Sequence, residues 1–151
     1  MNGALHLVAR VGTERFAFPV AQVDEVIDAP GISWVPGARG GLLGQLDLRD
    51  RTLSAYDGAW ALGIRRDAAA AANAAGGVGT ALVLRDRNER VALVVDDAED
   101  LRMVEPQSVR AVPGGADAEG VLRGVCIASE RDRRLVGLVR VSALFARVAA
   151  S

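Results

Sequence analysis

The sequence predicts a mainly β protein built from two similar small barrels that lie side by side. Two observations lead to this fold class. The chain of 151 residues has 17 glycines and only 4% aromatic residues, a composition that favours many tight turns over long bundled helices. In addition, one stretch of the first half returns in the second half, which indicates a duplicated unit.

The duplicated stretch is Leu7–Val26, which matches Leu82–Leu101 at a constant offset of 75 residues. Both stretches carry an arginine at the fourth position and a Glu-Arg pair between two apolar runs. The match continues after small insertions in three further pairs of segments: Val35-Pro36 with Val112-Pro113, Leu42–Leu48 with Val121–Ile127, and Leu53–Tyr56 with Leu135–Val139. Each half then holds about five short strands, which close most economically into a small barrel.

The first half shows the expected elements in order. Leu5–Val11 and Arg15–Val20 alternate around a Gly-Thr-Glu turn, so they predict a hairpin. Ala21–Ile27 has the spacing of a short helix or tight turn. Its apolar residues would then share one face: Val23, Val26 and Ile27.

Gly44–Asp57 predicts a second hairpin around a charged turn. Arg49 stands where the first strand ends. It is either a solvated turn charge or a cation directed at a nearby carboxylate. The candidate carboxylates are Asp47, Asp50 and Glu25.

The repeat predicts a single domain, residues 1–151, with approximate lobes at residues 1–64 and 80–151 that can exchange strands. Residues 65–79 are rich in Ala and Gly and lack the apolar periodicity that docks a helix, so they predict a connector. Ala143–Ala149 predicts a short amphipathic helix. Its apolar residues are spaced to cover a barrel end: Leu144, Phe145 and Val148.

Charge and composition narrow the function. A formal net charge of −1 produces no long-range field that attracts a polyanion, so we expect neither a nucleic acid nor an anionic membrane as partner. Cys126 is the only cysteine, which excludes an intramolecular disulfide and predicts a buried thiol. No apolar run reaches the length of a membrane span and no signal peptide is evident. We therefore expect a cytoplasmic protein whose partners are proteins.

Candidate catalytic groups are few. His6 is the only histidine and lies in an alternating strand, which favours a structural role. Asp96-Asp97 and Glu99-Asp100 have the chemistry of an acid–base pair or a cation site, but Asp24-Glu25 occupies the matching place in the first half. A feature present in both lobes favours a solvated or capping face. We expect no enzyme activity, no metal and no cofactor, with a small enzyme that uses acidic residues as the alternative from another class.

Three segments resemble the CheW family of chemotaxis adaptors. VAQVDEVI (Val20–Ile27), GQLDLRDRTLSAYD (Gly44–Asp57) and DGAWALG (Asp57–Gly63) are similar to the family segments V-x-E-V, G-[VI]-x-N-L-R-G and V-x-D-L-x-x-x-L-G. The resemblance implies two intertwined, five-stranded barrels of SH3-like type. It also implies a scaffold that couples the cytoplasmic tips of chemoreceptors to the regulatory domain of a CheA-like histidine kinase, and that contacts other CheW-like domains in array rings.

The resemblance also assigns residues. It places Val23, Glu25 and Arg49 at the receptor contact. It matches Val94, Val95 and Asp96 to a V-V-D strand end in the second lobe, and we interpret these as kinase-binding or inter-barrel residues. Trp34 joins this second set, because tryptophan is favoured at protein interfaces.

The chain departs from the family pattern at several positions: Asp47, Asp50, Ser54, Gly58 and Arg140. Asp50 replaces a turn glycine, and Asp tolerates positive φ better than most residues. We expect the turn to survive with Asp50 in that conformation. These departures affect which receptor and which kinase we expect the protein to bind. The pattern fits an adaptor of a pilus-type or other alternative chemosensory system equally well.

Overall fold

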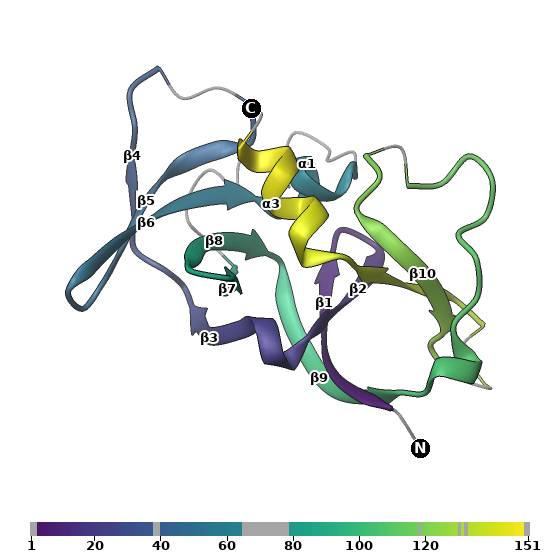
Figure 1. Cartoon of the computed structure of the whole chain (residues 1–151). Coiled ribbons are helices and arrows are strands. Elements are labelled where there is room, and N and C mark those ends of the chain that lie inside the picture. Colours follow the sequence, from purple (N-terminus) through teal and green to yellow (C-terminus); the bar gives the residue numbers. More distant parts are fainter. Residues whose placement is uncertain are drawn as a thin grey trace.

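The computed structural model describes residues 3–37, 40–64, 79–117, 119–129, 131 and 133–149 and is mainly β (Figure 1). The strands of the first half are β1 (Ala4–Val11), β2 (Glu14–Pro19), β3 (Val23–Asp28), β4 (Ile32–Trp34), β5 (Leu42–Leu48) and β6 (Arg51–Asp57). Those of the second half are β7 (Thr80–Asp86), β8 (Glu89–Val95), β9 (Asp97–Val104), β10 (Leu122–Ile127) and β11 (Leu135–Val139). The helices are short: α1 (Gly58–Leu62), α3 (Val141–Ala149), and the 3₁₀ helices η1 (Val20–Gln22) and η2 (Pro106–Ser108). Apart from Gly79, the predicted connector lies outside the described residues.

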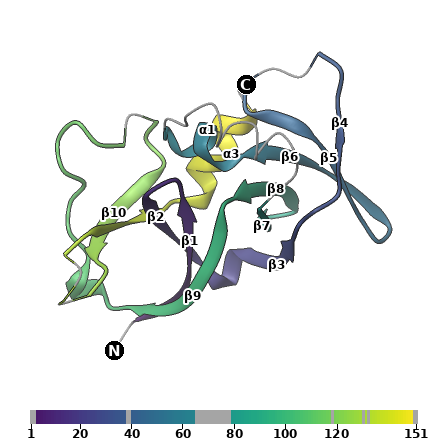
Figure 2. The ribbon, with the colours of Figure 1, turned by 180° about the vertical axis from the view of Figure 1, so that it is seen from behind.

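The strands form two sheets, and each sheet takes strands from both halves of the chain. The first sheet has the order β10-β11-β2-β1-β9, and the second has the order β3-β7-β8-β6-β5-β4. Figures 1 and 2 show β9 beside β1 from both sides of the molecule. Within the described residues, the end strands of each order are not paired with each other. The prediction of a mainly β, two-unit fold is therefore confirmed, although the ladders do not close into complete barrels.

The hairpins β1–β2 and β7–β8 have the same register. Arg10 pairs with Arg15 in the first, and Arg85 pairs with Arg90 in the second. The parallel neighbours also correspond, because Ala17 pairs with Leu138 of β11 and Ala92 pairs with Ala55 of β6. The offset of 75 residues found in the sequence is thus a structural repeat.

The structure corrects the prediction for Ala21–Ile27. Only Val20–Gln22 is helical, and Val23–Asp28 forms strand β3 against β7. Consequently Val23, Val26 and Ile27 do not share one face. Val23, which packs against the main core, and the exposed Val26 lie on one side of β3, whereas Ile27 packs against a small core of the second sheet. The tertiary pairing with β7 outweighs the helical spacing, which is a weak signal over seven residues.

The match of Leu42–Leu48 with Val121–Ile127 is one residue out of register. The structure makes Gly44 the counterpart of Gly124, because β5 and β10 each carry a register shift just before that glycine. A Cβ on Gly44 would lie 2.1 Å from the carbonyl oxygen of Ser33, and one on Gly124 would lie 2.9 Å from that of Arg110. Both glycines therefore permit close approach of a neighbouring backbone segment.

The main core lies between the two sheets. The hairpins β1–β2 and β7–β8 contribute one face each, with Leu7, Phe18, Leu82 and Leu93 among the buried side chains. The opposite face of β1–β2 packs into a small core of the first sheet, which contains the fully buried Cys126. The two sheets are thus held together by shared apolar burial as well as by exchanged strands.

In the part of the chain that the structure describes, the α-helices α1 and α3 lie against this main core. The predicted C-terminal helix is confirmed as α3, in which Leu144, Phe145 and Val148 are buried. Asp57 begins α1 by accepting a hydrogen bond from the amide of Ala59.

Candidate functional site

The edge strands β3 and β9 border an open apolar groove. Each is the end strand of its sheet, and Figures 1 and 2 both show them on the same side of the molecule. The groove has a volume of about 220 Å³. Its lining is almost entirely apolar and consists of Leu7, Val20, Val23, Val26 and Leu101, with Asp24 and Glu25 beside them.

The exposed apolar surface extends beyond the groove along β9 and β1. Val26 is 42% exposed and Leu101 is 59% exposed. Leu5 and Met103 form a cross-strand pair next to Leu101, and both are exposed. Clusters of exposed apolar side chains mark binding surfaces, whereas single ones are ordinary.

Sequence reasoning missed Leu101 and Met103. A signal existed, because the 75-residue repeat maps Val26 onto Leu101. Leu101 and Met103 could be recognised as candidate binding residues only once β3 and β9 were known to be edge strands of the two sheets.

Arg49 lies in the turn between β5 and β6 and reaches Glu25. Its Nη1 is 3.3 Å from Oε1 of Glu25, with the Arg49 side chain 78% exposed. Of the three candidate carboxylates, Asp47 instead accepts a hydrogen bond from Thr52. The expectation for the turn is corrected: Arg49 has the positive φ, at +55°, so the left-handed position falls one residue before Asp50.

Val94 and Val95 do not lie on a surface. Both belong to β8, and their side chains are fully buried. Direct contact with a partner protein would require the core to open. Val95 belongs to the main core between the sheets, whereas Val94 pairs with Asp57 of β6 within the second sheet and so joins the two halves of the chain.

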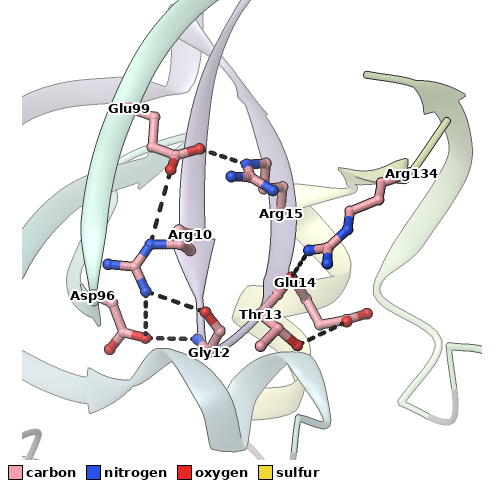
Figure 3. Close-up of polar contacts among 8 residues, drawn as sticks. All are labelled: Arg10, Gly12, Thr13, Glu14, Arg15, Asp96, Glu99 and Arg134. Atoms are coloured by element: carbon pink, nitrogen blue, oxygen red, sulfur yellow. Dashed lines mark hydrogen bonds and ion pairs between the residues drawn. The ribbon is translucent and has the colours of Figure 1, made fainter. Parts of the chain in front are cut away.

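Asp96 connects the second half to the β1–β2 turn, as Figure 3 shows. Its carboxylate accepts a hydrogen bond of 2.5 Å from the amide of Gly12 and lies 3.7 Å from Nη1 of Arg10. Gly12 has a φ of +63°, so the turn combines a left-handed residue with an anchored amide. Asp96 is therefore an inter-sheet contact in this structure.

The two tryptophans have different environments. Trp34 ends β4 at the edge of the second sheet and is 51% exposed. Trp60 is partly buried, and the guanidinium of Arg147 lies 3.9 Å from its ring centroid. Trp34 is thus the tryptophan that is free to contact another protein.

His6 is buried in β1. Its Nδ1 lies 2.9 Å from the carbonyl oxygen of Ala4, and its Nε2 lies 3.5 Å from Nη2 of Arg123. Burial lowers the pKa of His6 and the nearby Arg123 charge lowers it further, while the contact with Ala4 opposes this. In the described part of the chain, no group of three or more His, Cys, Asp or Glu side chains has the arrangement of a metal site.

Two interlocked sheets with an apolar groove and an exposed edge tryptophan define a protein-binding module. The family model described as the CheW-like domain matches residues 5–149, so the chain belongs to the CheW-like domain family. Comparison with curated proteins found no match.

Among solved structures, the chain is similar to the scaffolding protein TtCheW from Thermoanaerobacter tengcongensis, with a TM-score of 0.77 and 15% identity. The similarity covers 96% of this chain and 89% of that chain, and at this identity it establishes the fold. None of the helices in the described residues is long and apolar enough to cross a membrane.

Proposed function

We propose that this protein is a non-enzymatic, cytoplasmic adaptor that couples chemoreceptors to a CheA-type histidine kinase in bacterial chemotaxis. The observation that carries the proposal is the apolar groove between β3 and β9 in a CheW-like domain. An adaptor needs surfaces for two partners, and the chain offers two separate candidates. One is the groove, and the other is the edge at Trp34.

The groove suits the apolar face of a helix. An amphipathic helix binds by placing residues spaced at i, i+3 and i+4 into a groove of this kind. Val26 and Leu101 lie on opposite walls and are exposed, so they are available to such a helix. The helical hairpin at the tip of a chemoreceptor is the partner that we assign to this site. Val23 lines the groove, while Glu25 and Arg49 supply charged groups at its rim.

The kinase contact is assigned to the opposite end of the second sheet. Trp34 ends the edge strand β4, far in strand order from β3. An exposed tryptophan at an edge is a suitable anchor for an interface. In this proposal Val95 and Asp96 act as inter-sheet supports, because Val95 belongs to the main core and Asp96 holds the β1–β2 turn. Val94 joins the two halves through the pairing of β8 with β6.

The proposal is tested with Val26→Asp and Leu101→Asp. Each variant puts a carboxylate on an exposed wall of the groove, so the fold should remain intact. We expect binding to the chemoreceptor tip to weaken by about tenfold or more, because a docked apolar helix would desolvate the new charge. Titration calorimetry with a soluble receptor fragment measures the affinity, and a kinase regulatory domain is titrated in parallel. Val23→Asp is less suitable because Val23 packs against the main core.

Leu135→Asp is the matched control. Leu135 is 43% exposed, nearly the same as Val26, but it lies on β11 away from the groove. We expect receptor binding by this variant to equal that of the wild type. Equal receptor binding by Val26→Asp, Leu101→Asp and the control would contradict the assignment of the groove. The identity of the kinase that copurifies with the chain distinguishes chemotaxis from a pilus-type system.

A further inference from the structure

Both walls of the groove contain a β-bulge. Strand β3 has a bulge between Val23 and Glu25, and β9 has one opposite Val8 and Ala9. The extra residue is Asp24 in the first case and Glu99 in the second, since neither has a register partner. These two residues are 75 positions apart, like the hairpins that they face.

Each bulge carboxylate is held by a cross-strand pair of arginines. Asp24 lies 2.9 Å from Nε of Arg85 and 2.8 Å from Nε of Arg90. Glu99 lies 2.7 Å from Nε of Arg15 and 3.8 Å from Nε of Arg10, as Figure 3 shows. In both cases the arginines come from the other half of the chain, so each contact joins the two halves.

Further contacts extend each cluster along the chain. Arg85 also donates a hydrogen bond of 2.9 Å to the carbonyl oxygen of Ala21 in η1, which leads directly into β3. Arg10 also reaches Asp96, the residue that precedes β9. The entry of each edge strand is thus fixed by the same arginine that holds its bulge.

An edge strand has a ladder on one side only, so side-chain contacts contribute more to its position than they do in a central strand. A bulge disrupts that single ladder further. We propose that Asp24 and Glu99 are positioning residues that set the separation of the groove walls by fixing β3 to the hairpin β7–β8 and β9 to the hairpin β1–β2. This inference rests on the proposed function for its binding consequence, but not for its structural consequence.

The test uses the full chain with the isosteric neutral variants Asp24→Asn and Glu99→Gln. Hydrogen exchange measures the local opening of β3 and β9. We expect each variant to speed exchange by about tenfold in its own edge strand and to leave the other edge strand unchanged. We expect receptor-tip affinity to fall by about fivefold or more in each variant, because the groove is less preorganised.

Conservative variants separate positioning from general stabilisation. Asp24→Glu and Glu99→Asp keep the charge, and the two sites show that either carboxylate fits this geometry. We expect exchange and affinity within about twofold of the wild type in both. Asp100→Asn, on β9 beside Glu99, is the charge-matched control and should resemble the wild type.

Unchanged exchange in β3 of Asp24→Asn and in β9 of Glu99→Gln would overturn the inference. A uniform rise in exchange over the whole chain would also overturn it, because that result shows loss of global stability only. If the wild type does not bind a receptor tip, the proposed function fails while the exchange data still decide the role of the two carboxylates.

Discussion

Among the described residues, the side chain of Arg49 makes one charged contact, with a single nitrogen 3.3 Å from Glu25, and it is 78% exposed. Exposed ion pairs of this kind contribute little to stability. We therefore expect Arg49→Ala and Arg49→Lys to change the free energy of unfolding by no more than about 0.5 kcal/mol, as measured by denaturant titration.

Receptor binding by the same two variants distinguishes the roles of Arg49. A lysine can replace a one-nitrogen contact with Glu25, but it cannot replace a planar guanidinium that meets the receptor. We expect both variants to lose affinity for the receptor tip, which would show that the guanidinium contacts the partner. Wild-type affinity in both would make Arg49 an ordinary turn charge.

His6 makes stability depend on pH. Its pKa in the folded protein is lowered from 6.5, mainly by burial, so the folded state binds a proton less readily than the unfolded state. The stability from neutral His6 is present above pH 6.5 and is lost as the pH falls below that value toward the folded-state pKa. We expect the free energy of unfolding of the wild type to fall over this interval.

His6→Gln should reduce this part of the pH dependence, since the chain has no other histidine. The comparison uses denaturant unfolding of both proteins at several pH values below and above 6.5. Parallel pH profiles for the two proteins would contradict the assignment to His6. Any slope common to both belongs to other titrating groups.

At the scale of elements, Arg147 attaches α3 to α1. Its Nη2 donates a hydrogen bond of 2.7 Å to the carbonyl oxygen of Trp60, and its Nε donates one of 3.2 Å to that of Ala61. These carbonyls belong to the last turn of α1, where backbone donors are few, and that of Trp60 also accepts a hydrogen bond of 3.3 Å from the amide of Gly63. The same guanidinium stacks on Trp60 and lies 2.6 Å from Glu119. One side chain thus joins two helices and a loop.

We expect Arg147→Lys to lower the free energy of unfolding by about 1 to 2 kcal/mol, because lysine lacks the planar fork that serves two carbonyls and the ring together. Thermal and denaturant unfolding measure the change. Arg140→Lys is the control, since Arg140 is exposed at the start of the same helix. Equal stability of the two variants would show that the fork geometry of Arg147 is not needed.

At the scale of the molecule, the exchange of strands predicts how the two halves associate. The hairpin β1–β2 pairs with β9 and β11, and the hairpin β7–β8 pairs with β3 and β6. We expect a chain cut at a protease site inserted within residues 65–78 to remain assembled, because backbone hydrogen bonds and the shared core join the fragments.

Size-exclusion chromatography of the cut protein tests this expectation. The two fragments should elute together in native buffer and separate only in denaturant, while a denaturing gel confirms the cut. Separation in native buffer would show that the inter-half ladders do not hold the halves together without the covalent link.

The local features of the fold and its repeat could be predicted from the amino-acid sequence. Alternation in Leu5–Val11 and Arg15–Val20 predicted the first hairpin, and the offset of 75 residues predicted its copy at β7–β8. The spacing of Leu144, Phe145 and Val148 predicted the buried face of α3. These features were predictable because periodicity and turn chemistry act over a few neighbouring residues.

Which strands pair with each other became known from the folded structure. Periodicity assigns side chains to a face of a sheet but does not identify the neighbouring strand. The exchange of strands that forms the groove could therefore not be predicted from periodicity alone. The same pairing made Val23–Asp28 a strand, buried Val94 and Val95, and brought Asp24 to arginines some sixty residues away. Strand pairing is a long-range contact whose partners are chosen by the packing of the whole chain.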